Sequence, residues 1–156
     1  MGIEIERKYR VHTLKWIPLS HHHFTIRQGY LSTSAEQTIR VRCSDTQAWL
    51  TLKNKAHHGK RKEFEYPIPM EDALDMMDEW ASNQLIHKTR YHVMHEKKLW
   101  EVDVFHGPNE GLVIAEIELS STDEPFDLPT WVGEEVTEDH RFSNSNLSTN
   151  PFQNWR

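Results

Sequence analysis

Hydrophobic and polar residues alternate with a period of two along most of this 156-residue chain. The stretch from Ile3 to Val11 places apolar residues on one side of an extended chain and Glu4, Glu6 and Lys8 on the other, because successive strand side chains point to opposite faces. The same pattern predicts strands over residues 22–31, 37–43, 48–53, 61–66, 85–92, 99–105 and 112–119. Polar turns separate these segments, so most of the chain is expected to form hairpins.

Two other segments have helical spacing. Residues 71–81 carry an apolar stripe that includes Leu74, Met77 and Trp80. We interpret the methionines and the tryptophan of this segment as core, and the acidic residues at its start favour the positive N-terminal end of a helix. A short helix is expected over residues 139–147, closed by Asn150-Pro151, whereas residues 13–20 look irregular or briefly helical. No internal repeat or linker divides the sequence, so residues 1–156 are expected to form a single domain.

The polar faces of the expected strands are strongly charged. Their members are Glu4, Glu6, Lys8, Arg40, Arg42, Lys53, Arg61, Glu63, Glu65, Lys88, Arg90, Glu101, Asp103, Glu116 and Glu118. These faces could point to water from an open sandwich, or line the inside of a sheet that closes on itself. Basic strands lie mid-chain and acidic strands at both ends, which favours closure, because unpaired buried charge costs several kcal/mol per group and both signs would be required inside. Carboxylates there would suit a hard divalent metal, and guanidinium and ammonium groups would suit an anion.

Composition narrows the function classes. The 24 acidic residues outnumber the 18 basic ones, giving a formal charge of −6, which argues against general nucleic-acid binding. The single cysteine, Cys43, excludes an intramolecular disulfide, fits a reducing compartment and is expected to be a small core or rim residue. No apolar run is long enough for a transmembrane helix, so a cytoplasmic protein without a membrane partner is expected. The histidines of residues 21–23 are expected in a loop or at the start of the strand before Phe24, and those of residues 57–58 in a hairpin loop. Both groups are interpreted as exposed, with a loop preferred.

The ordered set of motifs resembles the CYTH superfamily, the triphosphate tunnel metalloenzymes, and within it the small single-domain bacterial type. The resemblance begins at Glu4-Ile5-Glu6-Arg7-Lys8 and continues in order over nearly the whole chain. The further segments are residues 26–31 (IRQGYL), 38–42 (TIRVR), 50–53 (LTLK), 61–66 (RKEFEY), 100–105 (WEVDVF), 115–119 (AEIEL) and 131–137 (WVGEEVT). The resemblance implies an α+β fold, in which a closed eight-stranded antiparallel barrel forms a tunnel with a few flanking helices. It also implies hydrolysis of inorganic triphosphate or a related triphosphate.

The same resemblance implies roles for individual residues. Glu4, Glu6 and Glu118 would hold one divalent ion, Mg²⁺ or Mn²⁺, and Asp103 and Glu116 would help hold a second ion that activates water. The substrate phosphates would be held by Lys8, Arg40, Arg42, Lys53, Lys88 and Arg90, with Arg61 as a further member. Tyr30 would be a tunnel tyrosine and proton acceptor, although an ordinary phenol, with a pKa near 10, is a poor base at neutral pH, so metal-activated water is preferred. Phe142 stands where relatives often place a tyrosine, which weakens any role for a hydroxyl at that point.

We therefore expect a metal-dependent tripolyphosphatase in which water attacks the terminal phosphorus in line. The alternatives are an adenylate cyclase or a thiamine or nucleoside triphosphatase of the same superfamily, or a polyphosphate-binding module without catalysis. The expected partner is a small triphosphate, and neither nucleic acid nor membrane. A homodimer is left open by the sequence.

Overall fold

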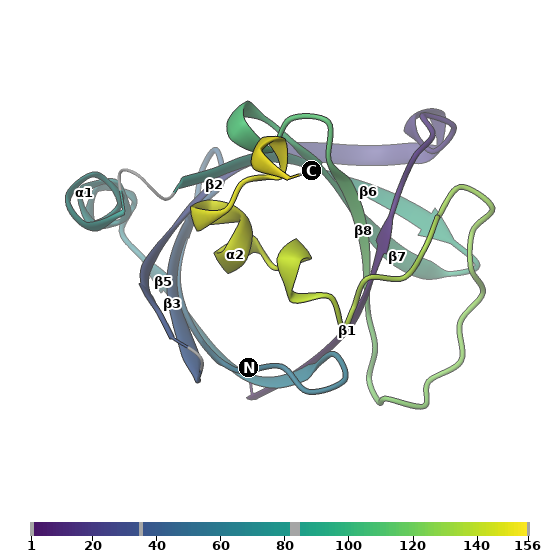
Figure 1. The fold of residues 1–156 in the computed structure, drawn as a ribbon, viewed down its shortest axis with the longest axis horizontal. Helices are drawn as coiled ribbons and strands as arrows, with labels where there is room; N and C mark the ends of the chain where they lie inside the picture. The colour runs from purple at the N-terminus through teal and green to yellow at the C-terminus, as the bar shows by residue number, and fades with distance from the viewer. Residues whose placement is uncertain (1, 35, 82–84, 156) are drawn as a thin grey trace.

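The computed structural model describes residues 2–34, 36–81 and 85–155. Within these residues, eight antiparallel strands close into a barrel in the order β1-β5-β4-β3-β2-β6-β7-β8 (Figure 1). The strands are β1 (Gly2–Arg10), β2 (Ser20–Thr33), β3 (Gln37–Cys43), β4 (Ala48–Asn54), β5 (Lys60–Ile68), β6 (Leu85–His95), β7 (Lys98–Phe105) and β8 (Val113–Glu118). The expectation of a closed barrel is confirmed, and the open sandwich is excluded.

Two α-helices flank the barrel in the described residues. Helix α1 (Met70–Trp80) packs on its outside, and α2 (Asn144–Thr149) lies across one opening in the view of Figure 1. The connecting segments contain single 3₁₀ turns at Ile17–Leu19, Gly107–Asn109, His140–Phe142 and Phe152–Asn154. The C-terminal part of the chain therefore covers the end of the barrel where β2 finishes and β6 begins.

Strand β1 closes the barrel by changing its neighbour half-way along its length. Its first half pairs with β5, so that Glu4 lies opposite Arg61, and its second half pairs with β8, so that Lys8 lies opposite Glu116. The switch falls at Glu6, whose backbone N–H donates to the Gly59 carbonyl at 3.0 Å. One strand thus brings its charged side chains against charges from two others.

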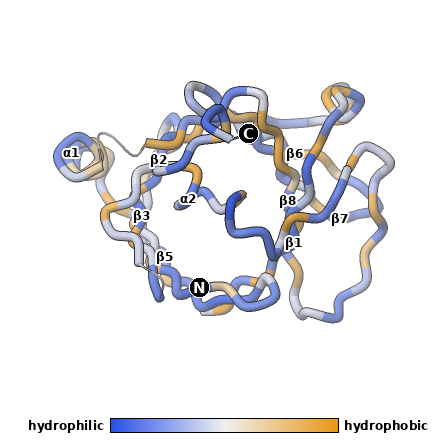
Figure 2. The backbone as a smooth tube through the Cα atoms, in the orientation of Figure 1, coloured by the Kyte–Doolittle hydropathy of each residue, from blue (hydrophilic) through white to orange (hydrophobic). Residues whose placement is uncertain are grey.

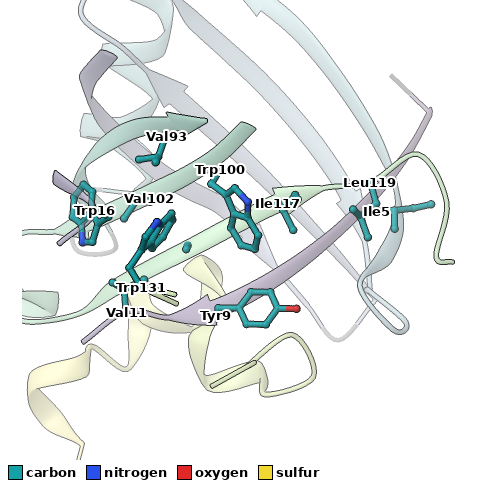
Figure 3. Close-up of a cluster of buried hydrophobic side chains, with 11 residues drawn as sticks. Ile5, Tyr9, Val11, Trp16, Val93, Trp100, Val102, Ile117, Leu119 and Trp131 are labelled. Atoms are coloured by element: carbon teal, nitrogen blue, oxygen red, sulfur yellow. The ribbon is translucent and has the colours of Figure 1, made fainter. Parts of the chain in front are cut away.

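The main hydrophobic cluster lies on the outer faces of β1, β7 and β8, so the barrel interior is left to polar groups. Alternation along the strands places Tyr9 and Trp100 in this cluster, together with the loop residues Trp16 and Trp131 (Figure 3). The rings of Trp100 and Trp131 meet edge to face with centroids 6.0 Å apart. Figure 2 shows the same alternation of hydrophilic and hydrophobic residues along the barrel strands.

Helix α1 covers β3 and β4 with a narrower face than its sequence predicts. Ala73 and Met77 are buried against Val41 and its neighbours, but Leu74 is 50% and Trp80 64% exposed. The interpretation as core is confirmed for Met77 and wrong for Trp80. The helix packs closely through small side chains. A Cβ atom on Gly29 would lie 2.7 Å from Cβ of Ala81, and this close approach leaves the larger flanking side chains in solvent.

The remaining differences concern segment ends. The histidines of residues 21–23 are exposed, as expected. Strand β2 begins at Ser20, so they lie at the start of a strand, which the sequence left open, and the preferred placement in a loop is wrong. The helix expected over residues 139–147 is wrong as one element, because Ser143 is extended (ψ 142°) and separates a 3₁₀ turn from α2. The Ser143 hydroxyl accepts from the Asn146 N–H and caps α2. Cys43 is buried in the core, as predicted.

Candidate active site inside the barrel

Charged side chains from seven strands converge on one cavity of about 200 Å³ within the barrel. Its wall is formed by Glu4, Glu6, Lys8, Tyr30, Thr38, Arg40, Arg42, Lys53, Arg61, Glu63, Glu65, Arg90, Glu101, Glu116, Glu118, Ser143, Asn144 and Ser145. The strands supply these side chains because every second residue points inward, whereas the last three come from the start of α2 and its cap. Of the site residues proposed from the sequence, all border this cavity except Lys88 and Asp103.

Asp103 and Lys88 lie behind the wall, fully buried. The Lys88 ammonium is 2.7 Å from Asp103 Oδ2, and the Arg90 guanidinium donates to both Asp103 oxygens at 2.8 and 2.9 Å. Burial alone would raise the pKa of Asp103, but the charges of Arg90 and Lys88 hold it well below its usual range. Lys88 also donates to Asn144 Oδ1 at 3.0 Å, which ties α2 to the barrel. Asp103 therefore orients Arg90, whose side chain reaches the cavity.

The carboxylates of β1 have unequal surroundings. Glu4 is bracketed by Lys53 at 3.1 Å and Arg61 at 3.0 Å, and these charges overcome burial and hold its pKa below the usual range. Glu6 has only longer contacts, 3.6 Å to Lys8 and 3.7 Å to Arg61. Burial, together with the nearby charges of Glu116 and Glu4, raises the pKa of Glu6 to about 7. An ionised Glu6 thus lacks full compensation from protein cations.

The same is true of Glu118, which lies opposite Glu6 in the β1–β8 pairing. Its pKa is raised by burial and then by the charges of Glu4 and Glu101. Carboxylate oxygens with uncompensated negative charge are suitable ligands for a hard divalent cation. In the described part of the chain, no three His, Cys, Asp or Glu side chains already converge as a coordination shell. The donor chemistry around Glu6 and Glu118 fits a divalent ion, with small side-chain adjustments.

The arginines have the opposite imbalance. Arg42 donates through Nε to Gln28 Oε1 at 2.8 Å and makes no ion pair with any described residue. Burial, with repulsion from Arg40 and Arg90, lowers the pKa of Arg42 to about 10. The buried Nε of Arg40 has no hydrogen-bond partner among the described residues. The nearest anion to Arg40 is Glu65, whose Oε2 lies 3.4 Å from Nη2. Arg42 therefore presents uncompensated positive charge and Arg40 a weakly paired guanidinium, which is the chemistry of an oxyanion site.

Several wall residues were not assigned a role from the sequence. Three of them, Glu63, Glu65 and Glu101, belong to the charged strand faces that the sequence predicts, without a role. Glu63 and Glu101 each lie two residues from one with an assigned role, and Glu65 lies two from Glu63. This spacing could have indicated that all three face the same cavity. Ser143, Asn144 and Ser145 gave no comparable signal, because only the folded chain brings α2 to the barrel. Phe142 packs in the hydrophobic cluster with Leu147 and lies outside the cavity, so no hydroxyl is offered from that position.

A second cavity, of about 520 Å³, adjoins the first and shares several of its wall residues, including Glu6, Lys8 and Arg61. It lies between the β4–β5 hairpin and the C-terminal segment, with His58 and Asn146 on opposite sides. The charged cavity can be reached from this side.

Comparison with known proteins matches residues 2–149 to the model of the CYTH domain. The chain belongs to the CYTH domain family. This CYTH domain is 40% identical over 156 residues to an inorganic triphosphatase of Acetivibrio thermocellus, covering 100% of the chain and 99% of the relative. It is 36% identical over 149 residues to an inorganic triphosphatase of Nitrosomonas europaea, covering 93% and 96%.

Solved structures support the same fold. A crystal structure of an inorganic triphosphatase is 35% identical, with a TM-score of 0.67 and coverage of 95% of both chains. A structure of a putative adenylate cyclase from Bacillus halodurans has a TM-score of 0.59 at 17% identity, covering 79% of this chain and 84% of that one. At that identity the second likeness shows the barrel fold alone. The superfamily resemblance seen in the sequence is thereby confirmed.

Proposed function

We propose that this CYTH domain hydrolyses inorganic triphosphate to diphosphate and phosphate with the help of a divalent cation. The observation that carries the proposal is the double charge imbalance across one cavity. Arg42 has no ion pair with any described residue, and Arg40 reaches only Glu65, at 3.4 Å. Glu6 has no cation closer than 3.6 Å, and Glu118 is in no ion pair among the described residues. A polyanion bound together with a divalent metal compensates both sides at once. The two relatives named as inorganic triphosphatases support this choice.

The chain's own residues would divide the work by position. Arg40 and Arg42 would hold phosphate oxygens through their planar guanidinium groups. Further positive charge and donors would come from Lys8, Lys53, Arg61 and Arg90. Glu6 and Glu118, with Glu4, would hold the cation. When bound, a divalent cation neutralises phosphate charge and lowers the pKa of a bound water. Positioning and charge compensation are the main requirements of phosphoryl transfer, and this wall supplies both.

The size of the cavity favours a small anion. Pockets for drug-sized ligands occupy roughly 300–1,000 Å³, whereas the charged cavity measures about 200 Å³ and is lined almost entirely by polar atoms. A nucleoside would have to remain in the adjoining cavity. We therefore propose that inorganic triphosphate is a better substrate than ATP or thiamine triphosphate.

Three finer points belong to the proposal. The cation would be Mg²⁺ or Mn²⁺. A second ion at Asp103 and Glu116 would require Arg90 and Lys88 to release Asp103, so we place the first ion at Glu6. Tyr30, whose hydroxyl accepts from Gln28 Nε2 at 3.2 Å, would help to orient the substrate or accept a proton.

The cellular location is a further part of the proposal. No helix among the described residues has the length and apolar character needed to cross a membrane. The cytoplasmic location, expected from the single cysteine and the lack of a long apolar run, stays a prediction, and a homodimer stays open.

Phosphate release by the purified protein tests the proposal. The substrate panel contains inorganic triphosphate, ATP, thiamine triphosphate and long-chain polyphosphate, each with Mg²⁺, Mn²⁺ or EDTA. Triphosphate should be the preferred substrate, and EDTA should abolish turnover. Formation of cyclic AMP, or faster hydrolysis of ATP, would replace the proposal with a cyclase or nucleotidase. Tight calorimetric binding of triphosphate without any phosphate release would make the protein a binding module.

A further inference from the structure

Three histidine rings meet at the end of the barrel where β2 begins and β6 ends. The ring centroid of His92 lies 5.5 Å from that of His22 and 6.1 Å from that of His21. This is the far end of β2 and β6 from α2, whose Leu147 packs with Tyr30 and Ile86. The histidines lie outside the wall of the charged cavity, but Glu101, next to His92, belongs to that wall.

An irregularity in β2 explains why consecutive residues reach the same ring. Ser20 pairs with Val93 and His22 with His92, so the register shifts and His21 is the extra residue of a bulge. A bulge sets two residues of one strand against one residue of its partner and redirects a side chain. His23 returns to regular alternation and faces the other way, with its ring 5.1 Å from that of Tyr91.

The His92 side chain has an unused polar atom. Its Nε2 is buried and has no hydrogen-bond partner among the described residues. The nearest carboxylate oxygen, Glu101 Oε2, is 3.7 Å away, too far for a hydrogen bond. Burial lowers the pKa of His92, which favours the neutral imidazole that metals bind.

Aromatic packing accounts for part of this arrangement, because the ring centroid of Phe24 lies 5.4 Å from that of His92 and 5.5 Å from that of His22. Packing does not account for the bulge that adds His21, or for the unpartnered nitrogen. Among the described residues, no three His, Cys, Asp or Glu side chains are close enough together to coordinate a metal as they stand. His21 and His22 are exposed, so their rings are free to rotate towards His92.

We propose that His21, His22 and His92, with Glu101 as a fourth ligand, form a site for a borderline transition-metal ion such as Zn²⁺ or Co²⁺. Imidazole nitrogen suits these ions, whereas Mg²⁺ prefers the oxygen ligands of the inner cavity. Glu101 Oε2 also accepts from Arg90 Nη1 at 3.2 Å. A metal ion bound by the histidines would therefore compete with Arg90 for the Glu101 carboxylate. Because Arg90 and Glu101 both line the charged cavity, metal binding at the histidines would affect that cavity.

The test is a titration of the untagged full-length protein with Co²⁺, followed by visible absorption, in excess Mg²⁺ that saturates the carboxylates. Zn²⁺ is then added to displace the Co²⁺. One equivalent should bind, with the absorption of a nitrogen- and oxygen-ligated ion. His22→Ala and His92→Gln should each weaken binding by about tenfold or more, since loss of even an outer-shell partner costs at least that much.

The matched control is His23→Ala, which removes a neighbouring exposed histidine from the opposite face and should change the dissociation constant less than about twofold. Equal weakening by His23→Ala would show adventitious binding to a histidine run, and would overturn the site. Unchanged binding in His22→Ala would do the same. Thermal melts monitor the partly buried His92→Gln variant. If it unfolds, the exposed substitutions His21→Ala and His22→Ala decide the outcome.

Discussion

Replacement of Glu6 by glutamine should stabilise the protein in the absence of metal, although it removes a residue proposed to be essential for function. Glu6 is buried inside the barrel near Glu116 and Glu4, and its closest cation, on Lys8, is 3.6 Å away. Glutamine has nearly the same shape and carries no charge. It therefore removes the repulsion and the desolvation cost of the ionised carboxylate while it keeps the packing.

The magnitude follows from the pKa of Glu6, which rises from its ordinary 4.5 to about 7 in the folded protein. A raised carboxyl pKa means that protonated Glu6 contributes stability fully below pH 4.5, and that this contribution is lost as the pH rises through about 7. The corresponding free energy is on the order of 3 kcal/mol at pH 8. For a chain of this size, that is roughly 6–12 °C in melting temperature.

The assay compares melting temperatures of wild type, Glu6→Gln and the exposed control Glu79→Gln in EDTA at pH 5 and pH 8. Glu6→Gln should melt well above wild type at pH 8 and close to it at pH 5, while Glu79→Gln should follow wild type at both. Addition of Mg²⁺ should then stabilise wild type more than Glu6→Gln, because the ligand has been lost. If Glu6→Gln is less stable than wild type at pH 8 in EDTA, the charge imbalance inferred for the cavity is wrong.

Four further outcomes are expected. Glu118→Gln should strongly reduce Mg²⁺-dependent phosphate release, and near wild-type rates across a metal titration would contradict its role as a ligand. Arg42→Lys should weaken calorimetric binding of triphosphate by about tenfold, since a point charge replaces a planar fork; equal affinity would remove Arg42 from the site. Steady-state kinetics should give a higher kcat/KM for triphosphate than for ATP, and the reverse order would favour a nucleotidase. Asp103→Asn should lower the urea-derived unfolding free energy by about 3–5 kcal/mol, because Arg90 and Lys88 lose a buried partner; a change below about 1 kcal/mol would show that this network is not structural.

The barrel itself was predictable because its strands obey a simple rule. A period of two gives each strand one charged and one apolar face, which fits both an open sandwich and a closed barrel. The position of basic strands mid-chain and acidic strands at both ends favours closure, because buried charges need partners of the opposite sign. The register was not predictable, since alternation permits many pairings. Nothing in residues 2–10 indicates that β1 leaves β5 at Glu6 and continues along β8.

The contribution of the C-terminal segment also depended on the fold. Ser143 ends one helical turn and caps the next, and this places Asn144 against Lys88. The residues next to Ser143 and Asn144 are polar, and no periodic pattern of apolar residues indicates that they face the barrel. Trp80 illustrates the opposite problem, because its spacing indicated a buried residue while the close contact of Ala81 with Gly29 leaves it in solvent.

The structure separates two kinds of buried charge that look identical in the sequence. Asp103 is fully satisfied by Lys88 and Arg90, with contacts of 2.7–2.9 Å, so Asp103 and Lys88 are complete without a ligand. Glu6 and Arg42 are partly buried without adequate partners, and each imposes a cost on the free protein. Such a cost persists in a folded protein where a ligand relieves it. Incomplete compensation, more than charge itself, therefore marks the residues that contact substrate and metal, and complete compensation marks those that hold them in position.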